Sequence, residues 1–396
     1  MNGSEHRQLR ILLIIDSYPP ILGGSEIEAQ RVSAALLRRG HKVKVLCAGG
    51  PPMPPVREWV DPEGVPVGIL TRHTRGRWKD MAFALEVAYE IWKGRKRYDI
   101  VYFLMQGLQV ATGLPTARFL GKVTVMKIAG SGVVAFMRRS RFGRLELDWM
   151  RKWKTPLMVL NEGMIEEALA DGFTREQLIW TPNPVDTDHF HPAEPADIAE
   201  WRTRHGIAPD AQVIIYVGRL APEKGLQPLL EGFAVAMKQA PRALLLLVGD
   251  GPTRPALEEM ARQIDPSLSR IRFAGRAPIA DVPRWLQASD LFALTSPSEG
   301  FACALVEAMS VGLPSVASAI PANLQLVEDG VHGLTVPWND ENAIGNAMLR
   351  LMADPEMRHR MGAAARARVV ENYSTDTVLS FYEKTFSRLI DEARTR

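Results

Sequence analysis

The sequence predicts an α/β protein built from two Rossmann-like, doubly wound domains. Short runs rich in valine, isoleucine and leucine alternate with amphipathic stretches along nearly the whole chain. Continuous apolar strands that alternate with helices are typical of parallel sheets covered on both faces. The alternation restarts after Thr181, and 396 residues are enough for two domains of roughly 100–200 residues each.

The expected strands form two series, one on each side of this restart. The first series is 9–15, 42–47, 99–104, 123–128, 157–160 and 178–181. The second series is 213–217, 244–248, 271–273, 291–294, 315–317 and 335–336.

The domain boundary is expected in 181–186 and the loop that follows, where Pro192, Pro195 and Pro209 recur. We predict domains over 1–185 and 190–375, with a C-terminal helix over about 376–396 that packs back on the first domain. Two such domains facing each other leave a central cleft bordered by the carboxyl ends of both sheets. Open α/β folds bind their ligands in such places.

The composition excludes several classes of protein. Hydrophobic residues make up 46% and charged residues 23%, which excludes disordered and low-complexity chains. Two cysteines, Cys47 and Cys303, cannot form a disulfide framework or the usual thiolate zinc site, and they favour a reducing compartment. The first apolar run ends at Asp16, too early for a signal peptide or a membrane span. We therefore expect a cytoplasmic protein.

The net charge of +3 divides unevenly. Residues 1–190 hold 27 Lys/Arg and 20 Asp/Glu (+7), and the remainder holds 21 and 25 (−4). Solvated helix faces are one explanation. The other is a surface for an anionic partner, such as the inner membrane leaflet or a lipid-diphosphate acceptor. No nucleic-acid partner is expected. The basic clusters are Arg72, Arg75, Arg77 and Lys79; Arg95, Lys96 and Arg97; and Arg138, Arg139, Arg141, Arg144, Arg151, Lys152 and Lys154.

The first candidate binding loop ends in Gly23 and Gly24. Ser25 and Glu28 have the spacing of a capping box, which predicts a helix directly after the glycines. Residues without a Cβ at a helix amino terminus let backbone N–H groups approach an anion, although a plain tight turn is the alternative. The loop lacks the G-x-G-x-x-G pattern of dinucleotide-binding proteins, and Cys47 rather than an acid closes the second strand.

The second domain places two cations after its first strand. Arg219 follows Gly218, and Lys224 comes five residues later. An arginine fork grips phosphate oxygens and a lysine adds a point charge, so the two suit a diphosphate. The turn at Gly275 and Arg276 ends a later strand; such turns often border a nucleotide base, but turn chemistry explains this one equally well.

Glu299 and Glu307 are the most informative pair. Glu299 lies in a glycine-bearing loop and Glu307 on the helix expected after it. A wholly helical span would separate them by about 12 Å. Retaining glycosidases need carboxylates about 5–5.5 Å apart, so the pair instead suits a long ligand held at two hydroxyl-bearing ends.

These residues resemble a known family. Glu299 and Glu307 match the E-x7-E signature of retaining glycosyltransferases of the GT-B fold, and the surrounding E-G-F-x-x-x-x-x-E-A-M-x-x-G-x-P pattern resembles glycosyltransferase family 4. Further matches run in the expected order from Gly23 through Gly218 and Arg219 to the turn at 328–330. The resemblance therefore covers almost the whole chain.

The resemblance implies a nucleoside-diphosphate sugar as co-substrate, bound mainly by the second domain, and a hydroxyl acceptor bound mainly by the first. Arg219 and Lys224 would bind the diphosphate and stabilise its charge as it leaves. Glu299 would bind hydroxyls of the transferred sugar, and Glu307 those of the ribose. The acceptor would be a lipid-linked glycan, a glycolipid or a small molecule.

The resemblance also assigns backbone contacts. The amides of Phe301, Ala302 and Cys303 would approach the sugar and phosphates, while Gly275 and Arg276 would flank the base. We expect no metal and no cofactor, because Arg219 and Lys224 would replace the metal used by other transferases.

The chain departs from the family's pattern in the first domain. Many members carry a histidine in the loop after the strand at 123–128, where this chain has Lys127 and Ser131. Both are therefore candidates for contact with sugar or acceptor; the alternative is that the acceptor itself differs from those usual in the family. Asn183-Pro184 stands where members have Asn-Gly, which should stiffen the hinge.

Two other patterns are given structural roles. Asp186-Thr187-Asp188 has the form of a D-x-D metal motif but lies in a segment that resembles the family's N-G-V-D turn. His189 and His191 lie in a proline-bounded linker without carboxylates after them.

The alternatives are a GT-B sugar-nucleotide epimerase, a binding protein that kept the cleft and lost turnover, and a nicotinamide oxidoreductase.

Acceptor choice is expected to reside in the loops at 51–59 and 71–79, which carry Trp59 and Trp78 beside basic residues.

Overall fold

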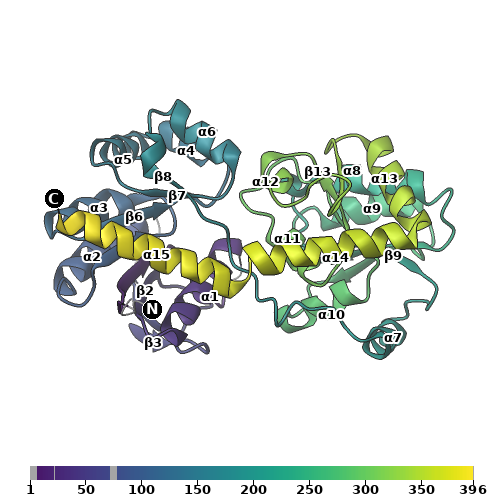
Figure 1. Cartoon of the computed structure of the whole chain (residues 1–396), viewed down its shortest axis with the longest axis horizontal. Coiled ribbons are helices and arrows are strands. Elements are labelled where there is room, and N and C mark those ends of the chain that lie inside the picture. The colour runs from purple at the N-terminus through teal and green to yellow at the C-terminus, as the bar shows by residue number, and fades with distance from the viewer. Residues whose placement is uncertain (1–6, 22, 72–77, 396) are drawn as a thin grey trace, which may run out of the picture. The chain divides into compact units, whose positions relative to one another are not determined.

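The computed structural model describes residues 7–21, 23–71 and 78–395. The chain forms two compact units, Met1–Pro184 with Thr375–Arg396, and Val185–Ser374 (Figure 1). The division falls beside the boundary predicted at 185–190. Within the described residues, none of the helices has the length and apolar character needed to cross a membrane.

The first unit contains an eight-stranded sheet in the order β3-β4-β2-β1-β5-β6-β7-β8. Every neighbouring pair is parallel except β3 and β4. The strands are β1 (Arg10–Ile14), β2 (Lys42–Ala48), β3 (Glu58–Val60), β4 (Pro66–Leu70), β5 (Ile100–Phe103), β6 (Val123–Lys127), β7 (Leu157–Val159) and β8 (Leu178–Trp180). The helices are α1 (Gly24–Arg38), α2 (Trp78–Lys93), α3 (Leu108–Phe119), α4 (Val133–Arg138), α5 (Arg141–Lys152), α6 (Glu162–Ala170), η1 (Arg175–Gln177) and α15 (Thr375–Arg394).

The second unit contains a six-stranded, wholly parallel sheet in the order β11-β10-β9-β12-β13-β14. Its strands are β9 (Gln212–Val217), β10 (Ala243–Val248), β11 (Ile271–Gly275), β12 (Leu291–Leu294), β13 (Ser315–Ser318) and β14 (Gly333–Val336). Its helices are α7 (Pro195–Arg204), η2 (Pro222–Lys224), α8 (Leu226–Ala236), α9 (Arg254–Ile264), η3 (Ile279–Asp281), α10 (Val282–Gln287), α11 (Cys303–Ser310), α12 (Pro321–Leu324), α13 (Glu341–Ala353) and α14 (Pro355–Asn372).

Both series of predicted strands are confirmed, with ends that differ by one or two residues. The prediction missed β3 and β4, which form an antiparallel hairpin. The chain before β4 is dense in proline and polar residues, so it has the composition of a loop. Asp61 closes the hairpin, because its Oδ1 accepts the N–H groups of Glu63 and Val65.

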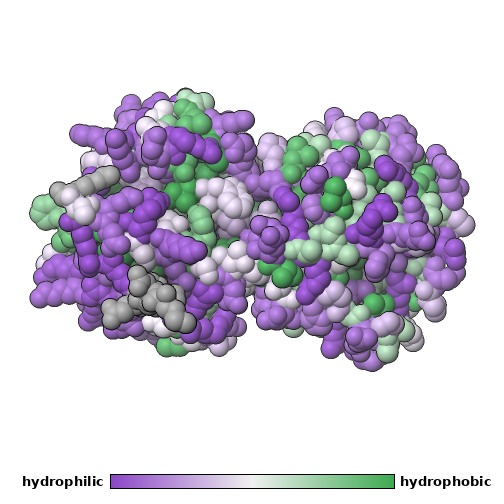
Figure 2. Space-filling model, in the orientation of Figure 1, coloured by the Kyte–Doolittle hydropathy of each residue, from purple (hydrophilic) through white to green (hydrophobic). Residues whose placement is uncertain are grey.

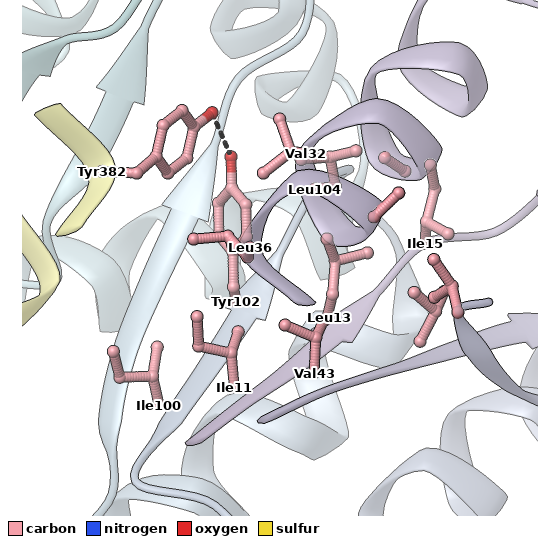
Figure 3. Packing of buried hydrophobic residues seen from close by; sticks show 14 of the residues in the cluster. Ile11, Leu13, Ile15, Val32, Leu36, Val43, Ile100, Tyr102, Leu104 and Tyr382 are labelled. Atoms are coloured by element: carbon pink, nitrogen blue, oxygen red, sulfur yellow. Dashed lines mark hydrogen bonds between the residues drawn. The ribbon is translucent and has the colours of Figure 1, made fainter. Parts of the chain in front are cut away.

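The core of the first unit joins the sheet to both ends of its chain. Apolar residues of β1, β2, β5 and α1 pack together around Tyr102 (Figure 3). Helix α15 adds Val378, Phe386 and Ile390 to the same cluster. The hydroxyls of Tyr102 and Tyr382 lie 3.3 Å apart. The last helix of the chain therefore belongs to the first unit. Hydrophilic side chains cover much of the face of the protein that Figure 2 shows.

A buried ion pair crosses this core. Lys127, at the end of β6, is fully buried and donates to Glu28 of α1, which is 4% exposed. It also donates to Asn183 at 2.7 Å and to the hydroxyl of Tyr382 at 3.3 Å. Burial is the largest single influence on Lys127 and opposes its charge, but Glu28 and Tyr382 together outweigh it and raise the pKa of the ammonium group.

This pair corrects a prediction from the sequence. The helix begins at Gly24, but the capping box is wrong: Gly23 is the N-cap residue and has no side-chain cap hydrogen bond. Glu28 instead turns into the core, where its carboxylate neutralises Lys127. The spacing of Ser25 and Glu28 fits either a capping box or a Glu28 side chain that faces the core. In the structure Glu28 faces the core because it pairs with the buried Lys127.

Removing one member of the pair should strongly destabilise the protein. Lys127→Met leaves the Glu28 carboxylate buried without its counter-charge, which typically costs about 3–5 kcal/mol. The double variant Lys127→Met/Glu28→Met removes both charges and should recover most of that loss. Urea unfolding of the single and double variants measures this, with exposed Lys384→Met as the control. Equal losses in the single and double variants would contradict the assignment.

Candidate functional site

The carboxyl edge of the second sheet is built from loops that pack backbone against backbone. Gly218 follows β9 and Gly249 follows β10, with φ angles of 155° and 145°. A Cβ on Gly249 would lie 1.8 Å from the carbonyl oxygen of Gly218, so only glycine fits. The N–H of Gly218 donates to Val248, and that of Gly249 donates to Gly275. The loops after β9, β10 and β11 are thereby held side by side.

A second backbone contact joins the loops after β9 and β12, which are neighbouring strands. Gly225 has a φ of 58°, and a Cβ there would lie 2.3 Å from the carbonyl oxygen of Thr295. The hydroxyl of Thr295 donates to the carbonyl of Gly225 at 2.7 Å. The residues on either side of this contact, Lys224 and the loop to Glu299, are consequently brought together.

Lys224 and Glu299 form an ion pair at this edge. The Nζ atom of Lys224 lies 2.7 and 2.9 Å from the two carboxylate oxygens of Glu299. The side chains are 24% and 9% exposed, so the pair is shielded from bulk water but open to a ligand on one side. Two residues singled out separately in the sequence therefore belong to one site.

Arg219 lies in the same loop but reaches solvent. Its carbonyl accepts the hydroxyl of Tyr216 at 3.0 Å, which fixes the backbone. Its guanidinium is 66% exposed and pairs with Glu223. Such a surface ion pair is weak, so the guanidinium can move to a phosphate at little cost.

Glu307 and the residues before it also lie where the sequence places them. Glu307 is half-buried on α11, and Phe301 and Ala302 are buried in the loop that leads into that helix. Cys303 begins α11, and its N–H donates to the carbonyl of Phe301 at 2.9 Å. Residues 299–302 lie outside the helix, so Glu299 is in a loop and Glu307 on the following helix, as predicted, and the separation of about 12 Å for a wholly helical span does not apply.

The remaining residues predicted in this unit have varied settings. Gly275 has a φ of 75°, and exposed Arg276 borders a cavity of about 420 Å³ with Trp201 and Trp285. Asp186 Oδ1 accepts the N–H groups of Asp188 and His189, the arrangement of a turn. In residues 7–21, 23–71 and 78–395, no cluster of three or more His, Cys, Asp or Glu could hold a metal ion.

In the first unit, the glycines predicted to face an anion have a carboxylate beside them. A Cβ on Gly23 would lie 2.3 Å from Glu26 Oε2, whereas a Cβ on Gly24 would have no neighbour within 4 Å. The hydroxyl of Ser17 donates to the other oxygen of Glu26 at 2.5 Å. An anion at this helix terminus would have to displace Glu26, and anion binding there stays a prediction.

The prediction that Lys127 lies in a loop for sugar or acceptor is wrong, because its side chain is buried in the ion pair with Glu28. Ser131 is exposed in the turn between β6 and α4. Of the two expected acceptor loops, 51–59 ends in β3, and 72–77 of the other lies outside the described residues.

A pair of perturbed carboxyl groups was missed. Asp16 follows β1, and its Oδ1 is buried without a hydrogen-bond partner among the described residues. Burial, with Asp80 and Glu26 nearby, raises the pKa of Asp16 to about 6. Burial also raises the pKa of Glu146 on α5 to about 8, although the Gly107 N–H stabilises its carboxylate. Glu146 stands at the helical spacing of the buried face of α5, which was the available signal.

The comparisons with known proteins agree for both halves of the chain. Residues 22–189 match the model described as Glycosyltransferase Family 4, and residues 197–368 match Glycosyl transferases group 1. The chain belongs to this glycosyltransferase family. Glu299, Glu307, Arg219 and Lys224 all lie within the second match. Two of these four, Lys224 and Glu299, form the ion pair at the edge of the second sheet.

Curated relatives of this family 4 member match over part of their length. An alpha-D-kanosaminyltransferase of Streptomyces kanamyceticus is 32% identical over 191 residues, 48% of each chain. A GDP-mannose-dependent monoacylated alpha-(1-6)-phosphatidylinositol monomannoside mannosyltransferase of Corynebacterium glutamicum is 30% identical over 200 residues, 49% of this chain and 51% of the relative. The chain thus spans about half the length of the curated relatives it matches.

The fold extends to solved structures. HepE of Anabaena, in complex with UDP and glucose, has a TM-score of 0.80 over 96% of this chain and 100% of its own, with 21% identity. The family 4 member therefore has the GT-B fold, in agreement with the predicted fold class.

Glu146 should make stability depend on pH. Its pKa is raised in the folded state, so it favours folding at low pH, and this stabilisation is lost between about pH 4.5 and 8. Glu146→Gln keeps an acceptor for the Gly107 N–H but removes the titration. We expect the variant to gain stability relative to the wild type from pH 5 to 9, by about 1.4 kcal/mol per unit of pKa shift at most. Urea unfolding across that range measures it, with exposed Glu166→Gln as the control; parallel profiles would refute it.

Proposed function

We propose that the protein transfers a hexose-type sugar from a nucleoside-diphosphate sugar to a hydroxyl acceptor, with retention of anomeric configuration and without a metal. The observation that carries the proposal is the Lys224–Glu299 ion pair beside Arg219 at the carboxyl edge of the second sheet. Open α/β sheets bind their ligands at that edge. The site combines cations for a diphosphate with carboxylates for hydroxyl groups, which is the layout of a nucleotide sugar.

The chemistry follows from where charge develops. As the bond between the anomeric carbon and the diphosphate oxygen breaks, negative charge grows on the diphosphate and the sugar becomes oxocarbenium-like. Fixed cations stabilise that transition state more than the ground state. Lys224 is held in place by Glu299 before the donor arrives, so little reorganisation is needed. Glu299 in turn accepts hydrogen bonds from sugar hydroxyls.

Retention requires the acceptor to attack from the face that the diphosphate leaves. The acceptor oxygen forms the new bond to the anomeric carbon, and its proton passes to an oxygen of the departing diphosphate. No enzymic nucleophile is invoked. Lys224 and Arg219 then have a double task, because they stabilise the leaving group and keep it next to the acceptor hydroxyl.

For the nucleotide base and for the acceptor, we propose classes of compound rather than single compounds. The printed name of the Corynebacterium relative specifies GDP-mannose, and the Anabaena structure contains UDP and glucose. Both nucleotides are therefore donor candidates. The acceptor is a hydroxyl compound, for which a lipid-linked glycan, a glycolipid or a small molecule would serve.

Nucleotide binding separates this function from a nicotinamide oxidoreductase, and turnover separates it from an epimerase or a binding protein. We expect UDP or GDP, or both, to raise the thermal midpoint of the protein, whereas NAD does not. A ligand at 100 times its dissociation constant adds about 2.7 kcal/mol of stability, which a thermal shift assay resolves. ADP serves as the comparison. Stabilisation by NAD alone would instead indicate a nicotinamide-dependent enzyme.

Arg219 and Lys224 should both contribute to the rate of sugar transfer. Arg219→Ala and Lys224→Ala should each lower kcat by roughly 10²–10³, the usual cost of one transition-state donor. The measurement is initial rates with the donor that the binding experiment selects, with and without EDTA. Exposed Arg242→Ala, 63% exposed in the same unit, is the matched control.

Two results would count against this assignment. An unchanged kcat in either variant would remove that residue from catalysis. Loss of activity with EDTA, restored by a divalent cation, would show that a metal does the work given to Arg219 and Lys224. Circular dichroism of Lys224→Ala checks that the variant still folds when Glu299 has lost its partner.

A further inference from the structure

Helix α2 has an apolar face on each side. Phe83, Ala84, Val87 and Ile91 are buried in the first unit. On the opposite side five large apolar residues are between 37% and 75% exposed, namely Trp78, Met81, Leu85, Tyr89 and Trp92. At 3.6 residues per turn these five lie within a stripe about 80° wide. We call them the α2 stripe.

The α2 stripe differs from ordinary exposed residues because it is contiguous and aromatic. Single exposed apolar residues are normal on a protein surface, but contiguous ones mark interaction sites. Tyrosine and tryptophan combine an apolar ring with a polar atom and are enriched where membranes meet water. Helix α2 carries two tryptophans, Trp78 and Trp92, and one tyrosine, Tyr89.

Cations stand directly beside the stripe. Lys93 Nζ lies 5.7 Å from the centre of the Tyr89 ring, and the guanidinium carbon of Arg95 lies 5.0 Å from that of Trp92. Lys96 and Arg97 follow in the next two positions. Long cationic side chains that lie along apolar rings keep their charged ends at the level of polar headgroups.

The same end of α2 borders a cavity of about 450 Å³ at the amino ends of β1 and β2. Its floor is apolar, formed by Ile11, Leu12, Val43 and Leu46. Among the described residues that line it, Glu90 is the sole carboxylate, against six cations: Arg10, Lys42, Lys44, Lys93, Lys96 and Arg97. We call this space the amino-edge cavity.

Three of these six cations have a carboxylate partner and three have none among the described residues. Arg10 pairs with Asp99, Lys44 with Glu58 and Lys93 with Glu90. The other three, Lys42, Lys96 and Arg97, form no ion pair with any residue that the structure describes.

The wall is also firmly built. Arg10 donates to Asp99 through two nitrogens and to the carbonyl of Lys96 at 3.1 Å. Tyr98, 5% exposed, donates to the carbonyl of Ile91. The backbone of the segment that carries Lys96 and Arg97 is thus tied to β1 and to α2.

We propose that the amino-edge cavity binds the phosphate headgroup of an anionic phospholipid, with the α2 stripe lying in the interface of the same leaflet. The two features adjoin, because Glu90 and Lys93 line the cavity while their neighbours Tyr89 and Trp92 belong to the stripe. The apolar floor and the stripe favour a lipid over a free phosphate, since an inorganic ion would use neither. Lys and Arg side chains near an anionic leaflet are attracted to its negative surface potential.

This docking site goes beyond the proposed transfer reaction and lies elsewhere on the unit. Arg10 and Lys42 begin their strands, whereas Gly23 and Ser131 follow the carboxyl ends of β1 and β6. The structure also narrows the basic surface expected from the sequence. Arg138 and Arg151 both pair with Asp171, whose side chain is 1% exposed, so they have a structural role. Arg72, Arg75 and Arg77 lie outside the described residues.

The test is co-sedimentation of the full chain with vesicles. We expect binding to an equal mixture of phosphatidylcholine and phosphatidylglycerol, at least tenfold tighter than binding to phosphatidylcholine alone and weakened by salt. Lys96→Glu/Arg97→Glu tests the cavity, and Tyr89→Ser/Trp92→Ser tests the stripe. Each double variant should bind the mixed vesicles at least tenfold more weakly. Lys238→Glu and Trp338→Ser, both exposed in the second unit, are the matched controls and should bind like the wild type.

Several outcomes would overturn the proposal. Equal binding to both vesicle types, or binding unchanged by the double variants, would do so. Inorganic phosphate that binds the wild type but not Lys96→Glu/Arg97→Glu, without any vesicle binding, would assign the cavity to a free anion instead. All variants should keep the wild-type thermal midpoint and the nucleotide-induced shift, so failure here is distinguishable from failure of the proposed transfer function.

Discussion

Backbone packing between glycine-bearing loops is the constraint on which the carboxyl edge of the second sheet depends. Gly225 meets Thr295, and Gly249 meets Gly218, at distances that leave no room for a Cβ. Parallel neighbours already place their loops at one edge, but the close approach brings Lys224 within hydrogen-bond distance of Glu299. Any side chain at Gly225 would separate the loops and with them the ion pair. The charged groups are thus positioned by residues that carry no charge.

In the first unit, a buried ion pair helps to hold helix α15 on the sheet. Its sheet must hold a helix, α15, that is separated from it in sequence by the whole second unit. Apolar contacts bring α15 to the sheet, but they are not directional. The Lys127 ammonium group is directional, because it donates to Glu28 of α1, to Asn183 and to Tyr382 of α15. A lysine in this setting fixes which part of α15 meets the sheet.

The parts of this molecule that follow from local pattern could be predicted from sequence. Continuous apolar runs identified the buried parallel strands, and the loops after them contained the residues that meet at the second sheet. The hairpin β3–β4 was missed because its short strands lie among prolines, and Asp61 closes it through contacts that no local pattern shows. Lys127 and Glu28 were misread for the same reason. Their roles depend on a partner 99 positions away.

Helix α2 connects the two edges of the first sheet. It follows β4 and precedes β5, so it starts at the carboxyl edge and ends at the amino edge. A Cβ on Gly50, just after β2, would lie 3.5 Å from Lys79 Nζ, which confirms where α2 starts. From Trp78 to Trp92 the helix rises about 21 Å, which is about the length of a typical strand and so about the distance between the two edges of a sheet. A leaflet along the α2 stripe would therefore touch the amino-edge cavity at one end and pass beside the carboxyl edge at the other. A lipid-linked acceptor could then reach that edge while its chain stays in the leaflet.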